Sequence, residues 1–212
     1  MSPVDGDGQR VREDRGGRPA VTSAHDLAAV AQRLFLEHGF DRTSVDDIAL
    51  TAGISRRTFF RYFPTKADVL FVESDAELRR LRENLVSGPA GETYQAVVTR
   101  SVIAALSIPP DQHTWALHRA QLLLSVPAVQ GPAMARYGRW RAAAAEFVGA
   151  RFGQPVDALF PVAVGHAVLA GTLAAHEHWA AHPEEDLFET VAQTLALLLP
   201  VEPLPANGRP VG

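Results

Sequence analysis

The sequence predicts an all-α fold, and three observations support that prediction. Apolar residues between positions 23 and 200 recur every three or four residues, which is the period of an amphipathic helix. Glycine and proline interrupt these segments, for example at Gly88 and Pro183. No segment of useful length alternates apolar and polar residues as a half-buried strand would. We therefore expect about nine helices and no β-sheet.

The composition is that of a globular protein with a sizeable core. Of the 212 residues, 47% are hydrophobic, which suits one large domain or a small module joined to a larger one. The chain has no cysteine, which excludes disulfides and thiolate metal sites, and no signal peptide is recognised, so we expect a cytoplasmic protein. The net charge of -4 gives no overall basic field, so any contact with nucleic acid requires a local basic cluster.

The two ends of the chain are expected to be disordered, as a leader over residues 1–22 and a tail over residues 201–212. Both contain few large apolar residues, so burial cannot offset the entropy that ordering would cost. Arginines in the leader could enter a DNA minor groove, as basic arms do. The acidic residues between them favour a flexible, solubilising segment instead.

The first expected helix begins after Ser23, which can cap it, and ends at Gly39. Its apolar positions follow the spacing of one helix face: Leu27, Val30, Ala31, Leu34 and Phe35. This stripe provides a surface on which the next helices can pack.

Two short helices joined by a glycine turn are expected to follow. Thr43 and Ser44 each precede an aspartate by three residues, which is the capping-box pattern of a helix start. Gly53 can turn the chain with a positive φ, Ser55 can cap the second helix, and Pro64 ends it. This pattern is typical of a helix-turn-helix motif.

The second of these helices lies in the stretch "ISRRTFFRYFPTK", residues 54–66, where aromatic and basic residues alternate without an acid. Phe59 and Phe63 are four residues apart and are expected to face the core, while Arg57 and Arg61 share the opposite face. Guanidinium groups suit guanine edges and phosphates, and an exposed phenylalanine can contact a thymine methyl group. The stretch therefore favours DNA binding, with a solvated basic face on an ordinary core helix as the alternative.

Residues 29–70, "AVAQRLFLEHGFDRTSVDDIALTAGISRRTFFRYFPTKADVL", closely resemble the DNA-binding domain of TetR-family transcriptional regulators. The shared pattern is a Gly-aromatic step, then Thr-Ser-Val, Ile-Ala, Ala-Gly-Ile-Ser, a threonine, an aromatic pair, a phenylalanine and a lysine. The resemblance implies a double-stranded DNA operator as partner. It also implies a DNA-binding domain over residues 23–70 and a domain for effector binding and dimerisation over residues 71–200.

The resemblance assigns roles to residues in this region. Base-edge readers would be Arg56, Arg57 and Phe60, and phosphate contacts would be Thr43, Ser44, Thr58, Arg61, Tyr62 and Lys66. Two positions depart from the family pattern, which often has glycine at position 57 and tyrosine at position 60. The sequence preference of the protein is therefore left open, and half-buried packing remains the alternative role for Phe60.

Further helices are expected at about residues 65–86, 92–107, 111–126, 128–152, 156–182 and 184–199. The family resemblance implies a homodimer formed through the last two long helices. The nearly continuous apolar segment 158–175 is long enough to raise the possibility of a membrane span, but Pro161, Gly165 and Gly171 weaken it. We expect no membrane contact and a dimer bundle, in which Gly165, Ala170 and Gly171 allow close helix approach; burial within one chain is the alternative.

Two clusters could line an effector cavity, since ligand pockets combine apolar walls with a few polar groups. They comprise Trp115, His118, Arg119 and Leu122, and Met134, Tyr137, Trp140 and Arg141. Plain core packing is the alternative. The segment from His178 onward, "HWAAHP...LFETVAQTLALLLP", weakly resembles actinobacterial regulators with acyl-CoA-like ligands. This implies a small lipophilic or acyl-bearing effector, whose anionic group arginines could meet.

Catalytic and metal motifs are not found. His178 and His182 share a helix face near His176, but a metal site would need a third ligand, and the chain has no cysteine. We therefore expect no metal, no cofactor and no enzymatic activity. The predicted function is a sequence-specific repressor released from a pseudo-palindromic operator by its effector. The alternative is a ligand-independent activator or global DNA-binding regulator.

Overall fold

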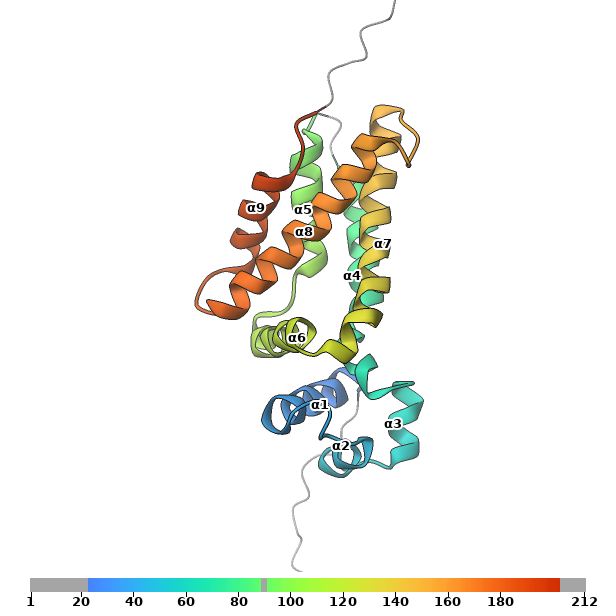
Figure 1. The fold of residues 1–212 in the computed structure, drawn as a ribbon, viewed down its shortest axis with the longest axis vertical. Helices are drawn as coiled ribbons and strands as arrows, with labels where there is room; N and C mark the ends of the chain where they lie inside the picture. Colours follow the sequence, from blue (N-terminus) through green and yellow to red (C-terminus); the bar gives the residue numbers. More distant parts are fainter. Residues whose placement is uncertain (1–22, 89–90, 203–212) are drawn as a thin grey trace, which may run out of the picture.

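A computed structural model of the chain describes residues 23–88 and 91–202. Every regular element in these residues is helical, which confirms the all-α prediction (Figure 1). The predicted leader and residues 203–212 of the predicted tail lie outside the described residues. The helices are α1 (Ala24–His38), α2 (Val45–Ala52), α3 (Arg56–Tyr62), η1 (Lys66–Phe71), α4 (Ser74–Val86), α5 (Tyr94–Leu106), η2 (Pro110–Gln112), α6 (His113–Ser125), α7 (Pro127–Phe152), α8 (Leu159–Ala181) and α9 (Leu187–Leu198).

Helices α1, α2 and α3 form one end of an elongated molecule, and the remaining helices form a larger body (Figure 1). Helix α6 lies across the body next to α1, whereas α4 and α7 run along its length. The buried apolar residues form two clusters that match these two parts of the molecule. One apolar cluster unites α1, α2, α3 and η1 with Leu122, Val129 and Ala133 from α6 and α7. The other cluster fills the body.

Local capping explains the ends of the first three helices. Ser23, Ser44 and Ser55 each accept a hydrogen bond from the backbone N–H three residues later. Ser44 also forms the complete capping box with Asp47, and Gly53 turns the chain with a φ of 68°. The Ser44 box, the Ser55 cap and the Gly53 turn are therefore those that the sequence predicts, whereas the second predicted box, at Thr43, does not form.

The predicted single helix over residues 65–86 is wrong, because the chain forms a 3-10 helix, η1, followed by a separate helix, α4. The Asp68 carboxylate accepts from the Thr65 backbone N–H at 2.9 Å, which starts η1. Its residues Val69, Leu70 and Phe71 are all buried. Three consecutive residues cover about 200° of an α-helix surface, so a regular amphipathic helix buries such a run poorly.

Two glycines in α8 allow close packing within the chain. A Cβ atom on Gly165 would lie 2.7 Å from the Arg141 carbonyl oxygen of α7, and one on Gly171 would lie 2.8 Å from a Leu195 methyl carbon of α9. These glycines therefore serve contacts between helices of one chain. This corrects the expectation that both provide close approach between two subunits.

Helix α8 has the length and hydropathy of a membrane span, and 33% of its most apolar window is buried in the described structure. Helix α8 packs on α6, α7 and α9. Several large apolar side chains on and near α8 and α9 remain exposed: Val156, Leu159, Val162, Leu197 and Leu198. Exposed apolar side chains thus lie on or next to both helices of this pair.

Candidate DNA interface and effector cavity

Two buried aromatic rings orient α3. Phe59 is fully buried and Phe63 nearly so, and the two rings are 5.8 Å apart. They pack in the core that α1 and α2 also build. The arginines at positions 56, 57 and 61 are consequently exposed on the remaining faces of the helix.

Arg56 is exposed but not free. Its Nη1 atom lies 2.8 Å from Oδ2 of Asp46 on α2, and its guanidinium lies 5.3 Å from the centre of the Phe60 ring. Both charged side chains are more than half exposed, at 57% and 66%. Asp46 thus holds the guanidinium between two helices. The sequence pattern places Asp46 only in a helix cap, because nothing in the spacing shows a contact with a residue ten positions away.

The other α3 residues that are predicted to contact DNA differ in how accessible they are. Arg57 is exposed and makes no hydrogen bond or ion pair within the described part of the chain. Phe60 is 43% exposed and meets Phe59 edge to face, so it combines partial packing with an accessible surface. Arg61 lies 5.3 Å from the Tyr62 ring centre, and the Thr58 hydroxyl lies 2.9 Å from the Ser55 hydroxyl.

Thr43 has a different role from the predicted phosphate contact. Its side chain is buried, and its hydroxyl lies 2.9 Å from the Gly39 carbonyl oxygen and 3.3 Å from that of Leu34. The hydroxyl therefore donates to the end of α1. Ser44 is partly occupied as well, since its hydroxyl donates to Asp47 at 2.6 Å. That hydrogen bond, with one from the Ser44 backbone N–H, lowers the pKa of Asp47.

Lys66 also turns inward. Its ammonium donates to the Phe40 carbonyl at 2.7 Å and to the Thr43 carbonyl at 3.1 Å, and it lies 4.3 Å from the Phe40 ring centre. Two of its three N–H groups are thereby used to join the α1–α2 loop to η1. Lys66 therefore has a structural role, and one N–H group is left for the phosphate contact that the resemblance implies, which stays a prediction.

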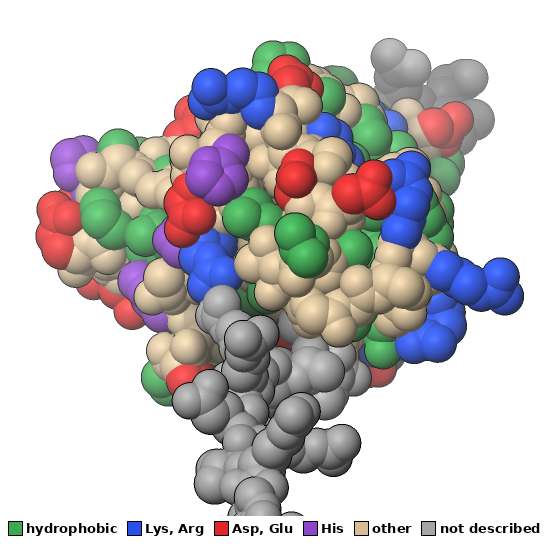
Figure 2. All heavy atoms as spheres, turned by 90° about the horizontal axis from the view of Figure 1, so that it is seen from below, with side chains coloured by type: hydrophobic (Ala, Val, Ile, Leu, Met, Phe, Trp, Pro, Cys, Tyr) green, Lys and Arg blue, Asp and Glu red, His purple; other side chains and the backbone are tan. Residues whose placement is uncertain are grey.

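Figure 2 shows the molecule from the end that carries these helices. Lysine and arginine side chains reach this face in separate patches, with acidic side chains between them. The face is therefore not uniformly basic, in keeping with the negative net charge of the chain. Contacts with DNA would depend on the positions of individual arginines rather than on a broad field.

A cavity of about 80 Å³ lies in the body, between α4, α6, α7 and α8. Three of the predicted ligand residues, Arg119, Tyr137 and Trp140, line it. Helix α6 contributes one continuous face to the wall: Ala116, Arg119, Ala120, Leu123 and Leu124. The cavity thus lies beside the junction between the body and the DNA-binding end.

Five predicted ligand residues do not line this cavity. Trp115 packs on His25 of α1, with ring centres 4.4 Å apart, and Leu122 belongs to the N-terminal core. Met134 and Arg141 are exposed, and His118 is half-buried outside the wall. Trp115 and Leu122 lie on the side of α6 that faces the DNA-binding end. The sequence did not show this, because periodicity identifies an apolar face without identifying its neighbour.

Arg119 connects the cavity wall to the DNA-binding end. Its guanidinium donates to both Glu77 carboxylate oxygens, at 2.6 and 3.1 Å, and its Nε donates to the Leu70 carbonyl of η1 at 2.8 Å. The Arg119 and Glu77 side chains are only 14% and 9% exposed. Burial alone would lower the pKa of Arg119, but the adjacent Glu77 carboxylate outweighs it and the pKa is raised. The Arg119 guanidinium therefore stays charged although it is buried.

Arg136 makes a second connection from the cavity wall to η1. It pairs with Asp68 at 3.1 Å, and its guanidinium lies 3.9 Å from the Phe71 ring centre. Neither contact is visible in sequence spacing, since the partners are more than sixty residues apart in the chain. Two arginines on different helices thus hold η1 against the cavity.

Neutral polar groups complete the cavity wall. Burial lowers the pKa of His176, whose Nδ1 lies 2.8 Å from the Thr172 carbonyl oxygen and therefore carries the proton. Burial also raises the pKa of Tyr137. The buried Trp179 indole nitrogen has no hydrogen-bond partner among the described residues. The wall therefore offers hydrogen-bonding groups beside a mainly apolar surface.

Comparisons with known proteins identify the family. Residues 27–72 match the model described as bacterial regulatory proteins of the TetR family, and residues 92–203 match the MftR C-terminal domain. The putative mycofactocin biosynthesis transcriptional regulator MftR of Mycobacterium tuberculosis is 32% identical over 167 residues. That match covers 79% of this chain and 84% of MftR.

Two further comparisons agree. The regulator EthR of Mycolicibacterium smegmatis is 44% identical over 75 residues, covering 34% of this chain and 35% of EthR. The crystal structure of Thermus thermophilus FadR, a TetR-family repressor in complex with lauroyl-CoA, superposes with a TM-score of 0.54. It is 27% identical, over 88% of this chain and 100% of that one. The chain therefore belongs to the TetR family of bacterial transcriptional regulators and is not an enzyme.

Proposed function

We propose that this regulator is a cytoplasmic, homodimeric repressor that a small lipophilic or acyl-bearing effector releases from a pseudo-palindromic operator. The observation that carries the proposal is the double connection between the cavity wall and η1. Arg119 reaches Leu70 and Arg136 reaches Asp68, so the helices that line the cavity also hold the segment leading to α3. Displacement of these helices would reach the DNA-binding end directly.

Recognition of DNA is assigned to α3. Arg57 is accessible for a base edge or phosphate, and Arg56 becomes accessible when it exchanges Asp46 for DNA. Because that pair is well exposed, water already screens it and the exchange costs about 1 kcal/mol or less. Arg61, Tyr62, Thr58 and Ser44 remain candidates for phosphate contacts.

Dimerisation is assigned to the outer surface of α8 and α9. Leu159 and Leu197 are 86% and 83% exposed, and Val162 and Leu198 add further apolar area. Such a surface is costly to leave in water and favours burial against a second copy. A dimer would present two α3 helices to successive major grooves, about 34–36 Å apart.

The effector is proposed to enlarge the cavity on binding. Sites for drug-sized ligands enclose about 300–1,000 Å³, which exceeds the 80 Å³ present here. A lipophilic ligand would therefore have to separate α6 and α7 from α4 and α8. The complex of the FadR structure with lauroyl-CoA supports an acyl-bearing ligand. Arg119 or Arg136 could meet its charged group, and Trp179 could donate to a carbonyl.

Release follows if the effector binds the widened form better than the DNA-bound form. Only such differential affinity can shift the equilibrium between the two forms. If α6 moves, Arg119 either separates from Glu77 or pulls Glu77 and Leu70 along. Both movements change the position of η1 relative to the body. The small size of the existing cavity also keeps the ligand-independent alternative open to test.

The test is fluorescence anisotropy on a labelled duplex from the upstream region of the protein's own gene. Lauroyl-CoA is added to the preformed complex, with free coenzyme A and lauric acid as matched controls. We expect lauroyl-CoA to lower the anisotropy in a saturable manner and coenzyme A alone to have no effect. Selective DNA binding that none of the three compounds changes would favour the ligand-independent regulator.

A further inference from the structure

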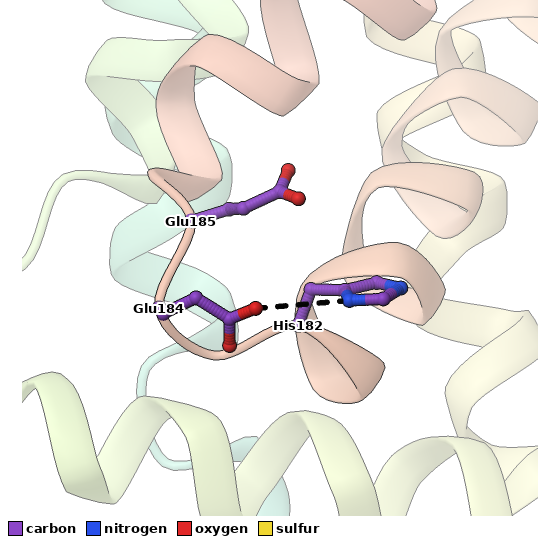
Figure 3. Close-up of side chains that lie close together, drawn as sticks. All are labelled: His182, Glu184 and Glu185. Atoms are coloured by element: carbon purple, nitrogen blue, oxygen red, sulfur yellow. Dashed lines mark ion pairs between the residues drawn. The ribbon is translucent and has the colours of Figure 1, made fainter.

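We propose that the connection between α8 and α9 binds one divalent transition-metal ion of the zinc, cobalt or nickel class. The ligands are His178, His182, Glu184 and Glu185. This site lies at the far end of α8 from the glycine contact with α7, and it is independent of the proposed effector chemistry. Three of the four ligands are drawn in Figure 3.

The imidazoles and carboxylates already lie close together. His178 and His182 are four residues apart, at the end of α8 and at its C-cap, and their ring centres are 4.6 Å apart. Nε2 of His178 lies 2.9 Å from Glu185. Nδ1 of His182 lies 3.8 Å from Glu184 (Figure 3). One ligand atom from each of His182, Glu184 and Glu185 lies within 4.8 Å of the others.

Side-chain rotations would have to complete the coordination, because only His182, Glu184 and Glu185 have ligand atoms within 4.8 Å of one another. Zinc–ligand bonds of about 2.0–2.2 Å place the ligand atoms of a tetrahedral ion roughly 3.3–3.6 Å apart. All four side chains are exposed, so their rotamers can adjust without disturbing the core. The backbone that carries them is held, since the Glu185 N–H donates to the His182 carbonyl at 3.1 Å. The turn therefore supplies the additional ligands that helix spacing alone did not reveal.

The electrostatic surroundings favour a cation. Between residues 152 and 202 the chain has no lysine or arginine. The acidic residues in this range are Asp157, Glu177, Glu184, Glu185, Asp186, Glu189 and Glu202. The C-terminal carbonyl groups of α8, which carry the negative end of the helix dipole, also point toward this turn. Positive charge is thus stabilised here from two sources.

The ligand set selects the class of ion. Two imidazole nitrogens with two carboxylates suit zinc, cobalt or nickel, whereas magnesium and calcium prefer oxygen ligands throughout. Binding would join the end of α8 to the turn that leads into α9 through metal–ligand bonds that the metal-free chain lacks. We therefore expect the ion to raise the thermal midpoint of unfolding.

The experiment uses the full chain without a histidine tag, treated with EDTA and dialysed. Zinc chloride is titrated calorimetrically into the wild type, His182→Ala and Glu185→Gln. The control is His38→Ala, because His38 is also exposed and lies 3.9 Å from a glutamate. We expect one ion per wild-type chain, at least about 10-fold weaker binding in both site variants, and unchanged binding in the control. Circular dichroism checks that each variant is folded.

Cobalt chloride provides a second readout, because four-coordinate cobalt absorbs visible light strongly. We expect that absorption in the wild type and its loss in Glu185→Gln, a substitution that preserves side-chain size. The proposal is overturned if zinc does not bind saturably, if both site variants bind it as the control does, or if magnesium binds equally well. The last result would indicate a non-selective acidic surface.

Discussion

Arg56 at the DNA-binding end and Arg119 in the body each lie at short distance from a carboxylate oxygen, at 2.8 and 2.6 Å. Their surroundings differ: the Arg56 pair is 57% and 66% exposed, whereas the Arg119 pair is 14% and 9% exposed. Water weakens the first pair, so its arginine can exchange partners at little cost. The second pair cannot be broken without leaving a buried charge. An arginine–carboxylate pair therefore suits DNA recognition where it is exposed, and it suits a fixed connection between helices where it is buried.

The largest expected effect comes from breaking the buried pair. Arg119→Met should lower the free energy of unfolding by about 3–5 kcal/mol, because Glu77 is left buried without its partner. Urea unfolding followed by circular dichroism measures the change. The matched control is Arg82→Met, whose pair with Glu146 is about half exposed and should cost about 1 kcal/mol or less. Equal losses would remove the distinction between the two kinds of pair.

A smaller loss is expected from Lys66→Met. The ammonium donates to two carbonyl groups, and a hydrogen bond to a charged group contributes about 1.5–3 kcal/mol to stability. Urea unfolding measures this loss, and DNA binding across a salt series tests whether Lys66 also contacts a phosphate. If Lys66 is structural, the slope of log K against log salt stays unchanged. A slope that is smaller by about 1 in the variant would show that Lys66 contacts a phosphate.

Arg56→Ala should leave stability nearly unchanged and weaken DNA binding by about 1–3 kcal/mol. The expected loss is specific to one base position, because Arg56 is assigned to a base edge. Anisotropy titrations on duplexes that vary one position at a time measure it. A uniform loss on all duplexes, with a reduced salt slope, would reassign Arg56 to a phosphate.

The smallest effect is expected from Asp46→Asn. Removing the charge frees Arg56 and reduces repulsion of phosphates, so DNA binding should strengthen by up to about 1 kcal/mol. Asn retains much of the side-chain shape, and urea unfolding should show little change. Weaker DNA binding in this variant would mean that Asp46 orients Arg56 rather than competing for it.

The same comparison explains what could be predicted from the sequence. At the DNA-binding end, local signals determine the fold, such as the Ser44 cap, the Gly53 turn and the spacing of Phe59 and Phe63. Exposed α3 arginines follow from that spacing. The inward positions of Thr43 and Lys66 do not, because they depend on carbonyl groups in a loop.

In the body, long-range packing decides which residues line the cavity. Periodicity identified α6 and α7 and the residues Arg119, Tyr137 and Trp140, but Trp115 packs on α1 instead. Contacts such as Arg119 with Leu70 join residues that are distant in the chain. No local pattern marks them, so they could be found only in the folded structure.

The central claim, that a dimer reads DNA through α3, is tested most directly by selecting bound duplexes from a random-sequence pool and sequencing them. We predict enrichment of a pseudo-palindrome whose half-sites lie about one helical turn, 10–10.5 base pairs, apart or a multiple of it. Arg56→Ala should relax one base position in each half-site. Recovery of a single unpaired half-site would contradict the dimer, and recovery of no motif at all would contradict sequence-specific reading by α3.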